Sequence, residues 1–92
     1  MGLDKSSDNA ARESWRFVIS GVVQGVGYRW FARGEAERLG VRAEARNLPD
    51  GTVEVRAQAS ADLLEKFRQR LGEGPAHARV DRVEIAKQKP TD

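Results

Sequence analysis

Four short stretches of the chain are predicted to be β-strands, and hydrophobic and polar residues alternate most clearly in the first and third of them. In the first, Trp15, Phe17 and Ile19 fall on one side, while mostly polar residues occupy the other. A period of two is typical of a strand with one buried face. The third stretch alternates in the same way, with valine or alanine at every second position. The predicted strands cover residues 15–20, 41–47, 52–59 and 79–87.

Two further stretches carry apolar residues at helical spacing. The first helix is predicted to begin near Tyr28 and to end before Gly40, because glycine is favoured directly after a helix. The second is predicted to follow Ser60, whose hydroxyl can cap it, and to end in the Gly-Glu-Gly-Pro segment 72–75. The residues expected to face the core are Tyr28, Phe31, Ala32, Ala36 and Leu39 in the first helix, and Leu63, Leu64, Phe67 and Leu71 in the second.

The elements follow one another in the order β-α-β-β-α-β, and Leu48-Pro49-Asp50-Gly51 forms a strong hairpin signal between the second and third strands. This order predicts an α+β, ferredoxin-like sandwich, with an antiparallel-dominated sheet and two helices on one face. The first and third strands are expected to be central neighbours. The domain is expected to span residues 15–87, between a flexible N-terminal tail (1–14) and a polar C-terminal tail (88–92).

Composition narrows the class of protein. The chain has 92 residues, of which 39% are hydrophobic and 33% charged, as is typical of one small soluble globular domain. Its 16 basic and 14 acidic residues are too balanced to indicate a nucleic-acid or membrane partner. The absence of cysteine excludes disulfides, thiolate metal sites and a cysteine nucleophile. Together with the lack of an apolar signal-peptide core at the N-terminus, it fits a cytoplasmic location.

Candidate chemistry is concentrated where the first strand meets the first helix, at Gly21-Val22-Val23-Gln24-Gly25-Val26-Gly27-Tyr28-Arg29. Unpaired N–H groups and the helix dipole favour an anion at such a junction. Gly25 and Gly27 can adopt positive φ, and the forked guanidinium of Arg29 matches a phosphate. The segment therefore predicts an oxyanion cradle, most simply for a phosphoryl group. The alternative is a tight turn whose glycines only reverse the chain.

The known nucleotide-binding glycine loops do not match this segment. No Lys-Ser or Lys-Thr closes the loop, and Trp30 stands where the dinucleotide pattern needs its third glycine. A nucleotide site is therefore not supported.

The segment from Val18 to Arg29 resembles the signature of the acylphosphatase family, with Ile19 and Ser20 in its variable places. A second family segment is an asparagine shortly before Asp-Gly-Thr-Val, found here as Asn47 followed by residues 50–53. A third, weaker one covers residues 78–83. Together the segments follow the order and spacing of the family over most of the chain.

The resemblance implies a metal-independent hydrolase that splits the carboxyl–phosphate bond of small acyl phosphates into a carboxylate and inorganic phosphate. It also implies that Arg29 and Asn47 are catalytic. The implied phosphate-binding residues are Gln24, Gly25, Val26, Gly27, Tyr28 and Arg29. A carboxylate leaving group hardly needs a general acid, so hydrolysis needs mainly charge neutralisation and a water placed in line. The amide of Asn47 could hold that water, although without the resemblance Asn47 would be interpreted as a turn residue.

Two departures from the family keep a second function open. The chain has Ala43-Glu44-Ala45 where the family usually has Gly-Trp-Val, and its polar end replaces the usual C-terminal fifth strand. The second strand would then form a sheet edge, which its exposed charges suit. A monomer is expected, with a dimer through this open edge as the alternative. The alternative function is a phosphate- or anion-binding module with little or no turnover.

Other candidate residues point to structural roles. His77 is the only histidine, lacks a second ligand at metal spacing and is expected in a loop or on the surface. Neither a metal nor an organic cofactor is predicted. Asp50 and Asp81 are better explained by a turn and by a strand start than as catalytic bases. Binding of single-stranded RNA follows from the fold class alone, and the third strand lacks the aromatic residues on which bases would stack.

Overall fold

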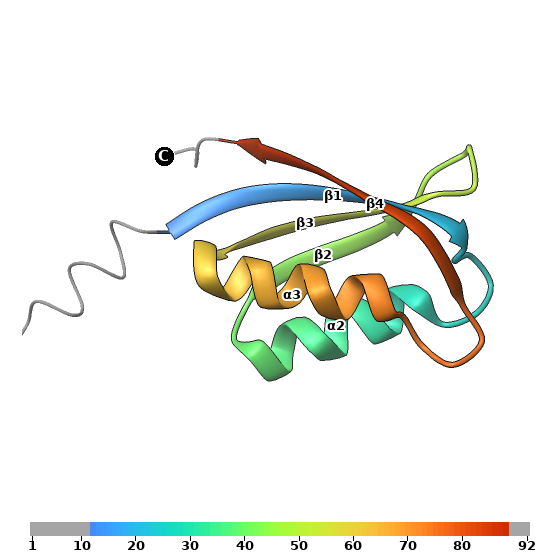
Figure 1. Cartoon of the computed structure of the whole chain (residues 1–92), viewed down its shortest axis with the longest axis horizontal. Coiled ribbons are helices and arrows are strands. Elements are labelled where there is room, and N and C mark those ends of the chain that lie inside the picture. Colours follow the sequence, from blue (N-terminus) through green and yellow to red (C-terminus); the bar gives the residue numbers. More distant parts are fainter. Residues whose placement is uncertain (1–11, 89–92) are drawn as a thin grey trace, which may run out of the picture.

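The computed structural model describes residues 12–88 and arranges them as four strands and two helices (Figure 1). In chain order the elements are β1 (Arg12–Val22), α2 (Tyr28–Leu39), β2 (Arg42–Asn47), β3 (Val53–Ser60), α3 (Ala61–Glu73) and β4 (Arg79–Gln88). The predicted order of elements is confirmed. The first strand begins at Arg12 rather than at Trp15, so residues 12–14 pair in the sheet, and the rest of the predicted N-terminal tail lies outside the described residues. Of the predicted C-terminal tail, Gln88 belongs to β4, and residues 89–92 lie outside the described range.

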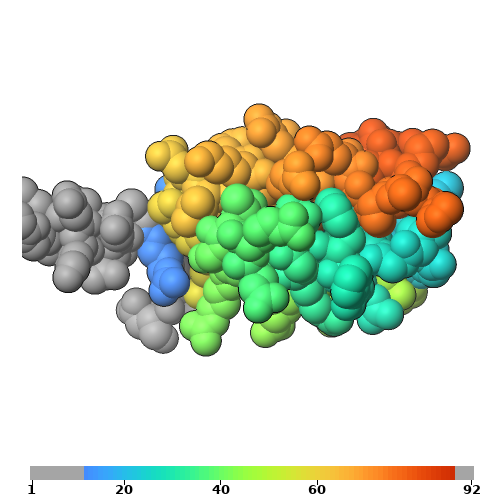
Figure 2. Space-filling model, turned by 90° about the horizontal axis from the view of Figure 1, so that it is seen from below, coloured from blue at the N-terminus to red at the C-terminus, as the bar shows by residue number. Residues whose placement is uncertain are grey.

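The sheet is antiparallel throughout and has the order β2-β3-β1-β4. β1 and β3 are central neighbours, as predicted, with Ile19 paired to Val53 and Arg12 to Ser60. Within residues 12–88 no fifth strand lies beside β2, so β2 forms one edge of the described sheet. Both helices lie on the same face of the sheet (Figure 1), and Figure 2 shows them side by side as the outer layer.

The hydrophobic core fills the space between the helix layer and the sheet. Phe17 of β1 meets Phe67 of α3 edge to face, with ring centroids 5.8 Å apart. Phe31, Leu39 and Leu63, which were predicted to face the core, are only partly buried at its margin. The largest buried side chains are Trp15, Tyr28, Phe17, Phe67, Ile19, Leu64 and Leu71. Neither helix of the described range is long and apolar enough to cross a membrane.

A bulge in β1 precedes the glycine-rich loop. Ser20 pairs with Arg82, whereas the next residue, Gly21, pairs with Val80, so the register against β4 shifts between them. Gly21 has φ 131°, and a Cβ there would lie 2.0 Å from the backbone oxygen of Arg79. No side chain fits at this contact, which explains why a glycine ends the regular part of the strand.

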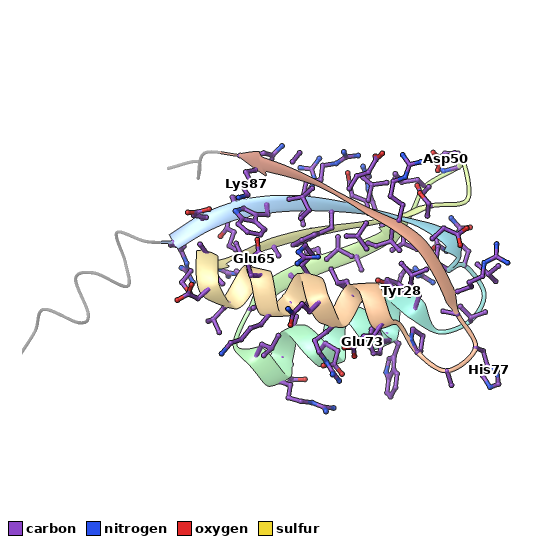
Figure 3. All side chains as sticks on the ribbon, in the orientation of Figure 1. Tyr28, Asp50, Glu65, Glu73, His77 and Lys87 are labelled. Atoms are coloured by element: carbon purple, nitrogen blue, oxygen red, sulfur yellow. The ribbon has the colours of Figure 1, made fainter. Side chains whose placement is uncertain are left out.

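Three connections gather at one end of the molecule. The β1–α2 loop, the β2–β3 hairpin and the α3–β4 connection all lie on the right in Figure 1, and Figure 3 places Asp50 and His77 there. The hairpin closes through hydrogen bonds from Leu48 N to Thr52 O (2.9 Å) and from Gly51 N to Leu48 O (3.1 Å). The hairpin thereby ends β2 at the same end of the sheet as the end of β1, with β3 between the two strands, and this end carries the candidate site.

Candidate active site

The loop between β1 and α2 has an open helix N-terminus. Gly25 and Gly27 have φ 77° and 79°, in the left-handed region that favours glycine. Gly27 is the N-cap of α2, and its carbonyl accepts the N–H of Phe31 at 3.0 Å. Among the residues that the structure describes, no side chain caps this helix and no acidic residue lies in its first turn. The leading amide groups and the helix dipole are therefore free to face an anion.

Sheet pairing brings Asn47 to this loop. Asn47 is the last residue of β2 and pairs with Val53, which in turn pairs with Ile19 shortly before the loop. A pocket of about 160 Å³ lies between the loop and the end of β2. Its lining residues are Val23, Gly25, Gly27, Tyr28, Arg29, Trp30, Arg33 and Asn47. The structure thus collects Arg29, Asn47 and both loop glycines in one pocket.

Gln24, predicted to bind phosphate, does not line this pocket. Its side-chain Nε2 donates to the backbone oxygens of Leu48 (2.9 Å) and Thr52 (2.8 Å). Both amide hydrogens are therefore used to join the glycine-rich loop to the hairpin that follows Asn47. Any contact of Gln24 with a phosphoryl group would come from its backbone N–H.

Tyr28 and Val26 also turn their side chains away from the pocket's polar groups. Tyr28 is 1% exposed, and its hydroxyl donates to the backbone oxygen of Leu71 at 2.7 Å. Burial raises the pKa of this phenol, which keeps it protonated. Val26 packs against the edge of the core and is absent from the pocket lining. The loop therefore presents mainly backbone groups to a ligand.

Two residues that the sequence did not single out contribute to the pocket. Trp30 lies at the rim with 81% of its surface exposed. Arg33 of α2 lines the same pocket and approaches Ala45 O with its Nη2 at 3.5 Å. A signal was available, because a residue four positions after Arg29 on a helix lies on the same side as Arg29.

The charges around the pocket are positive. Arg29 and Arg33 line it, and none of its lining residues is acidic. Asp50, in the hairpin, accepts hydrogen bonds from the side chain and backbone of Thr52 at 2.6 and 3.0 Å, which lower its pKa. It acts as a turn residue, as predicted. His77 is exposed in the α3–β4 connection, and no group of three or more potential metal ligands occurs among the described residues.

Comparisons with known proteins agree on one family. A family model described as Acylphosphatase matches residues 15–92. The chain is 49% identical to an acylphosphatase of Alkalilimnicola ehrlichii over 80% of this chain and 83% of that protein. It is 50% identical to one of Thermus thermophilus over 74% of this chain and 77% of that protein. Among solved structures, an acylphosphatase from Coxiella burnetii superposes with a TM-score of 0.87 and 30% identity, covering 95% of this chain and 92% of that one.

Proposed function

The chain belongs to the acylphosphatase family and hydrolyses acyl phosphates, and we propose that it does so in the pocket between the β1–α2 loop and the end of β2. The observation that carries this proposal is the meeting of Arg29, Asn47 and the loop glycines in one small pocket. In the proposed division of work, the loop and Arg29 bind the phosphoryl group, and Asn47 positions the attacking water.

Binding of the phosphoryl group rests on preorganised positive charge. The backbone N–H groups of residues 24–29 surround the uncapped start of α2, and the Arg29 guanidinium offers paired donors to two phosphoryl oxygens. The loop amides are fixed by the backbone before the substrate arrives, and together with Arg29 they stabilise the charge that builds up as the bond to the acyl oxygen breaks. Loss of one preorganised donor of this kind costs about 10²–10³ in rate.

Asn47 serves the nucleophile. Its side-chain oxygen accepts a hydrogen bond from a water molecule and holds the water's lone pair toward phosphorus, in line with the departing oxygen. The new P–O bond forms as the bond to the carboxylate breaks, and the carboxylate leaves with the bonding electron pair. The water's proton passes to a phosphoryl oxygen and then to solvent, because an amide does not accept it. The products are a carboxylate and inorganic phosphate.

The scheme requires no metal ion. A carboxylate is a weak base and leaves without protonation, so Lewis-acid activation of the leaving group is unnecessary. The charge on the phosphoryl oxygens is met by Arg29, with Arg33 adding a second cation at the same pocket. The small opening grips the phosphoryl group and leaves the acyl group largely in solvent, which predicts tolerance of different acyl groups.

The test is hydrolysis of benzoyl phosphate in the presence of a chelator, by wild type, Arg29→Ala and Asn47→Ala. Arg38→Ala provides a matched control, since Arg38 is an exposed arginine of the same helix outside the pocket. We expect turnover in wild type and the control, and a loss of about 10²-fold or more in both site variants. Folded wild type that binds phosphate without turnover would contradict the scheme and favour an anion-binding module. Turnover that vanishes with the chelator would contradict metal independence.

A further inference from the structure

The face of the sheet opposite the helices carries the net charge of the described residues. Among residues 12–88 no layer covers it (Figure 1). Strand register places six arginines and three glutamates on it, whereas the charges elsewhere in the described part cancel, with eight basic and eight acidic residues. The charged residues of this open face are Arg12, Arg16, Arg42, Glu44, Arg46, Glu54, Arg56, Arg82 and Glu84.

Glu54 organises the centre of the open face. Its side chain is only 3% exposed, yet it accepts hydrogen bonds from Arg16 Nε and from Arg46 Nε, the latter at 2.8 Å, and lies 3.5 Å from Arg56 Nε. Burial alone would raise the pKa of this carboxyl, but the hydrogen bonds and charges of the arginines outweigh burial and lower the pKa. Glu54 therefore stays ionised, holds Arg16 and Arg46 by hydrogen bonds, and attracts Arg56 as an ion pair.

The anchored arginines keep their outer ends available. Each approaches Glu54 through Nε, and none makes another side-chain hydrogen bond within the described residues. The side chains of Arg46 and Arg56 remain 68% and 59% exposed. One carboxylate is thus shared by three guanidinium groups, which leaves an excess of positive charge and unused Nη donors facing solvent.

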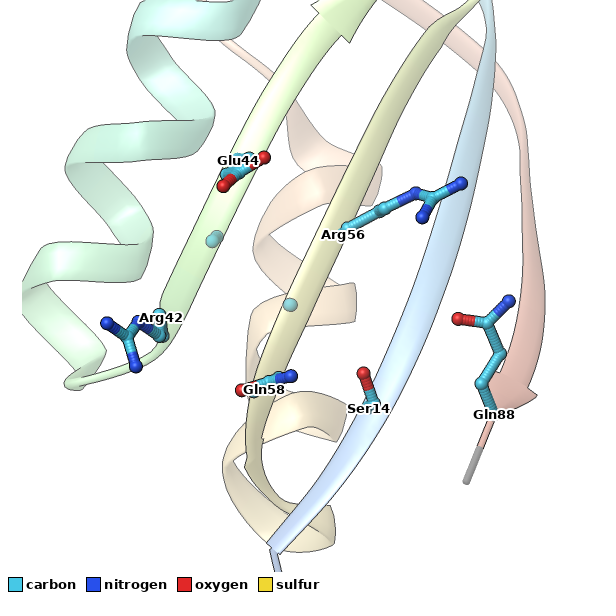
Figure 4. A pocket seen from close by; sticks show the side chains of 8 residues that line it. Ser14, Arg42, Glu44, Arg56, Gln58 and Gln88 are labelled. Atoms are coloured by element: carbon cyan, nitrogen blue, oxygen red, sulfur yellow. The ribbon is translucent and has the colours of Figure 1, made fainter. Parts of the chain in front are cut away.

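Two shallow depressions adjoin this cluster. One, of about 480 Å³, crosses the four strands and is lined mainly by polar side chains; Figure 4 labels Ser14, Arg42, Glu44, Arg56, Gln58 and Gln88. The other, of about 330 Å³, runs beside it over Glu44, Arg46, Glu54 and Arg56. Glu44 is the acidic residue common to both, and arginines outnumber it in the larger depression. Neither shares a lining residue with the pocket of Arg29 and Asn47.

We propose that the open face binds an acidic polypeptide segment of a partner through Arg16, Arg46 and Arg56. The larger, polar depression, called the groove below, receives the rest of that segment. Guanidinium groups match side-chain carboxylates in planar, paired hydrogen bonds, and arginine is the cation enriched at protein interfaces. The glutamine side chains of the groove can bond the amides and carbonyls of an extended peptide. A single-stranded nucleic acid fits less well, because the open face has no aromatic residue for base stacking.

The test is binding of a fluorescein-labelled decaglutamate peptide, followed by anisotropy at low ionic strength. The key variant is the double substitution Arg46→Gln, Arg56→Gln. The matched control is Arg38→Gln, Arg68→Gln, which removes the same charge from the helix layer. The key variant loses two exposed arginine–carboxylate pairs with the peptide. Such pairs contribute up to about 1 kcal/mol each, so this variant should bind up to about 30-fold more weakly than wild type. The control should bind within about twofold of wild type.

Two further measurements locate the peptide. Inorganic phosphate should weaken peptide binding no more than sodium chloride of the same ionic strength, because the pocket of Arg29 and Asn47 is separate, and amide chemical shifts should change along β2 and β3. Lack of peptide binding by wild type, equal weakening in the control, or displacement by phosphate beyond that of the matched salt would each overturn the proposal. Tighter binding of an oligothymidine of equal charge at the same amides would overturn the polypeptide assignment. Circular dichroism confirms that each variant is folded.

Discussion

Substitution of Gln24 tests whether its link between the glycine-rich loop and the hairpin after Asn47 positions Asn47 relative to the loop. Its amide group spans from the glycine-rich loop to two carbonyls of the hairpin that follows Asn47. The substitution Gln24→Met keeps the length of the side chain and removes both donors. We expect Asn47 to lose its fixed position relative to the loop, while the loop keeps its glycines, its open helix end and Arg29.

The cost in stability can be estimated from the hydrogen bonds. Each neutral hydrogen bond contributes about 0.5–1.5 kcal/mol net. Both acceptors retain a second donor, because Leu48 O accepts from Gly51 N and Thr52 O accepts from Leu48 N. Neither carbonyl is therefore left unsatisfied, and the two losses together should remove about 1–3 kcal/mol from the free energy of unfolding. The effect on catalysis should be larger, since a misplacement of about 1 Å can cost about 10²-fold in rate.

The assay combines urea unfolding with benzoyl phosphate kinetics and inhibition by inorganic phosphate. Gln58→Met is the matched control, because Gln58 is a partly buried glutamine of β3 outside the pocket of Arg29 and Asn47. We expect kcat to fall at least about tenfold in Gln24→Met, with little change in phosphate inhibition, and the control to match wild type. A kcat equal to that of wild type, together with the expected loss of stability, would refute the positioning role. A parallel loss of phosphate inhibition would show that Gln24 shapes the cradle itself.

Two further predictions concern the scaffold. Glu54→Gln should lower the free energy of unfolding by about 1–3 kcal/mol near neutral pH. The pKa of Glu54 is lowered in the folded protein. The stability that ionised Glu54 contributes is therefore complete above the ordinary glutamate pKa of about 4.3 and is lost as the pH falls through the lower pKa of the folded state. A difference in urea unfolding between wild type and Glu54→Gln that did not change with pH would contradict this. Gly21→Ala should destabilise by about 3 kcal/mol or more, since its Cβ would meet Arg79 O at 2.0 Å. Gly34→Ala, with open space in α2, should instead stabilise by about 0.5–1 kcal/mol, and similar melting temperatures for the two variants would contradict the account of the bulge.

The fold could be predicted closely because local signals agreed with one another. The sequence signals for β1, β3 and the helix ends each involve only a few neighbouring residues. The structure confirms them: Ser60 Oγ accepts a hydrogen bond from Leu63 N at the start of α3, and Gly40 has φ 78° directly after α2. The strand start at Arg12 was missed because residues 12–14 lack apolar alternation. They join β1 through pairing with β3 and β4, which a local pattern does not reveal.

Features that depend on contacts between distant residues were not predictable. Glu35 and Glu54 are buried charges that the helical and strand patterns place among ordinary polar positions. Glu35 is held by Arg70 of the other helix at 2.9 Å, and this hydrogen bond lowers its pKa despite burial. Glu54 is held by arginines of two neighbouring strands. The use of Gln24 as a link to the hairpin has the same origin, since its acceptors lie far along the chain.

Phosphate binding by wild type, Arg29→Ala and Asn47→Ala tests the proposed division of work most directly. Titration with inorganic phosphate, followed by calorimetry or amide chemical shifts, measures the cradle without turnover. The proposed roles predict that Asn47→Ala binds phosphate about as tightly as wild type although its turnover is lost, because Asn47 serves the water. Arg29→Ala should lose both binding and turnover. Equal loss of phosphate binding in the two variants, or undiminished binding in Arg29→Ala, would contradict the assignment of the cradle to the loop and Arg29.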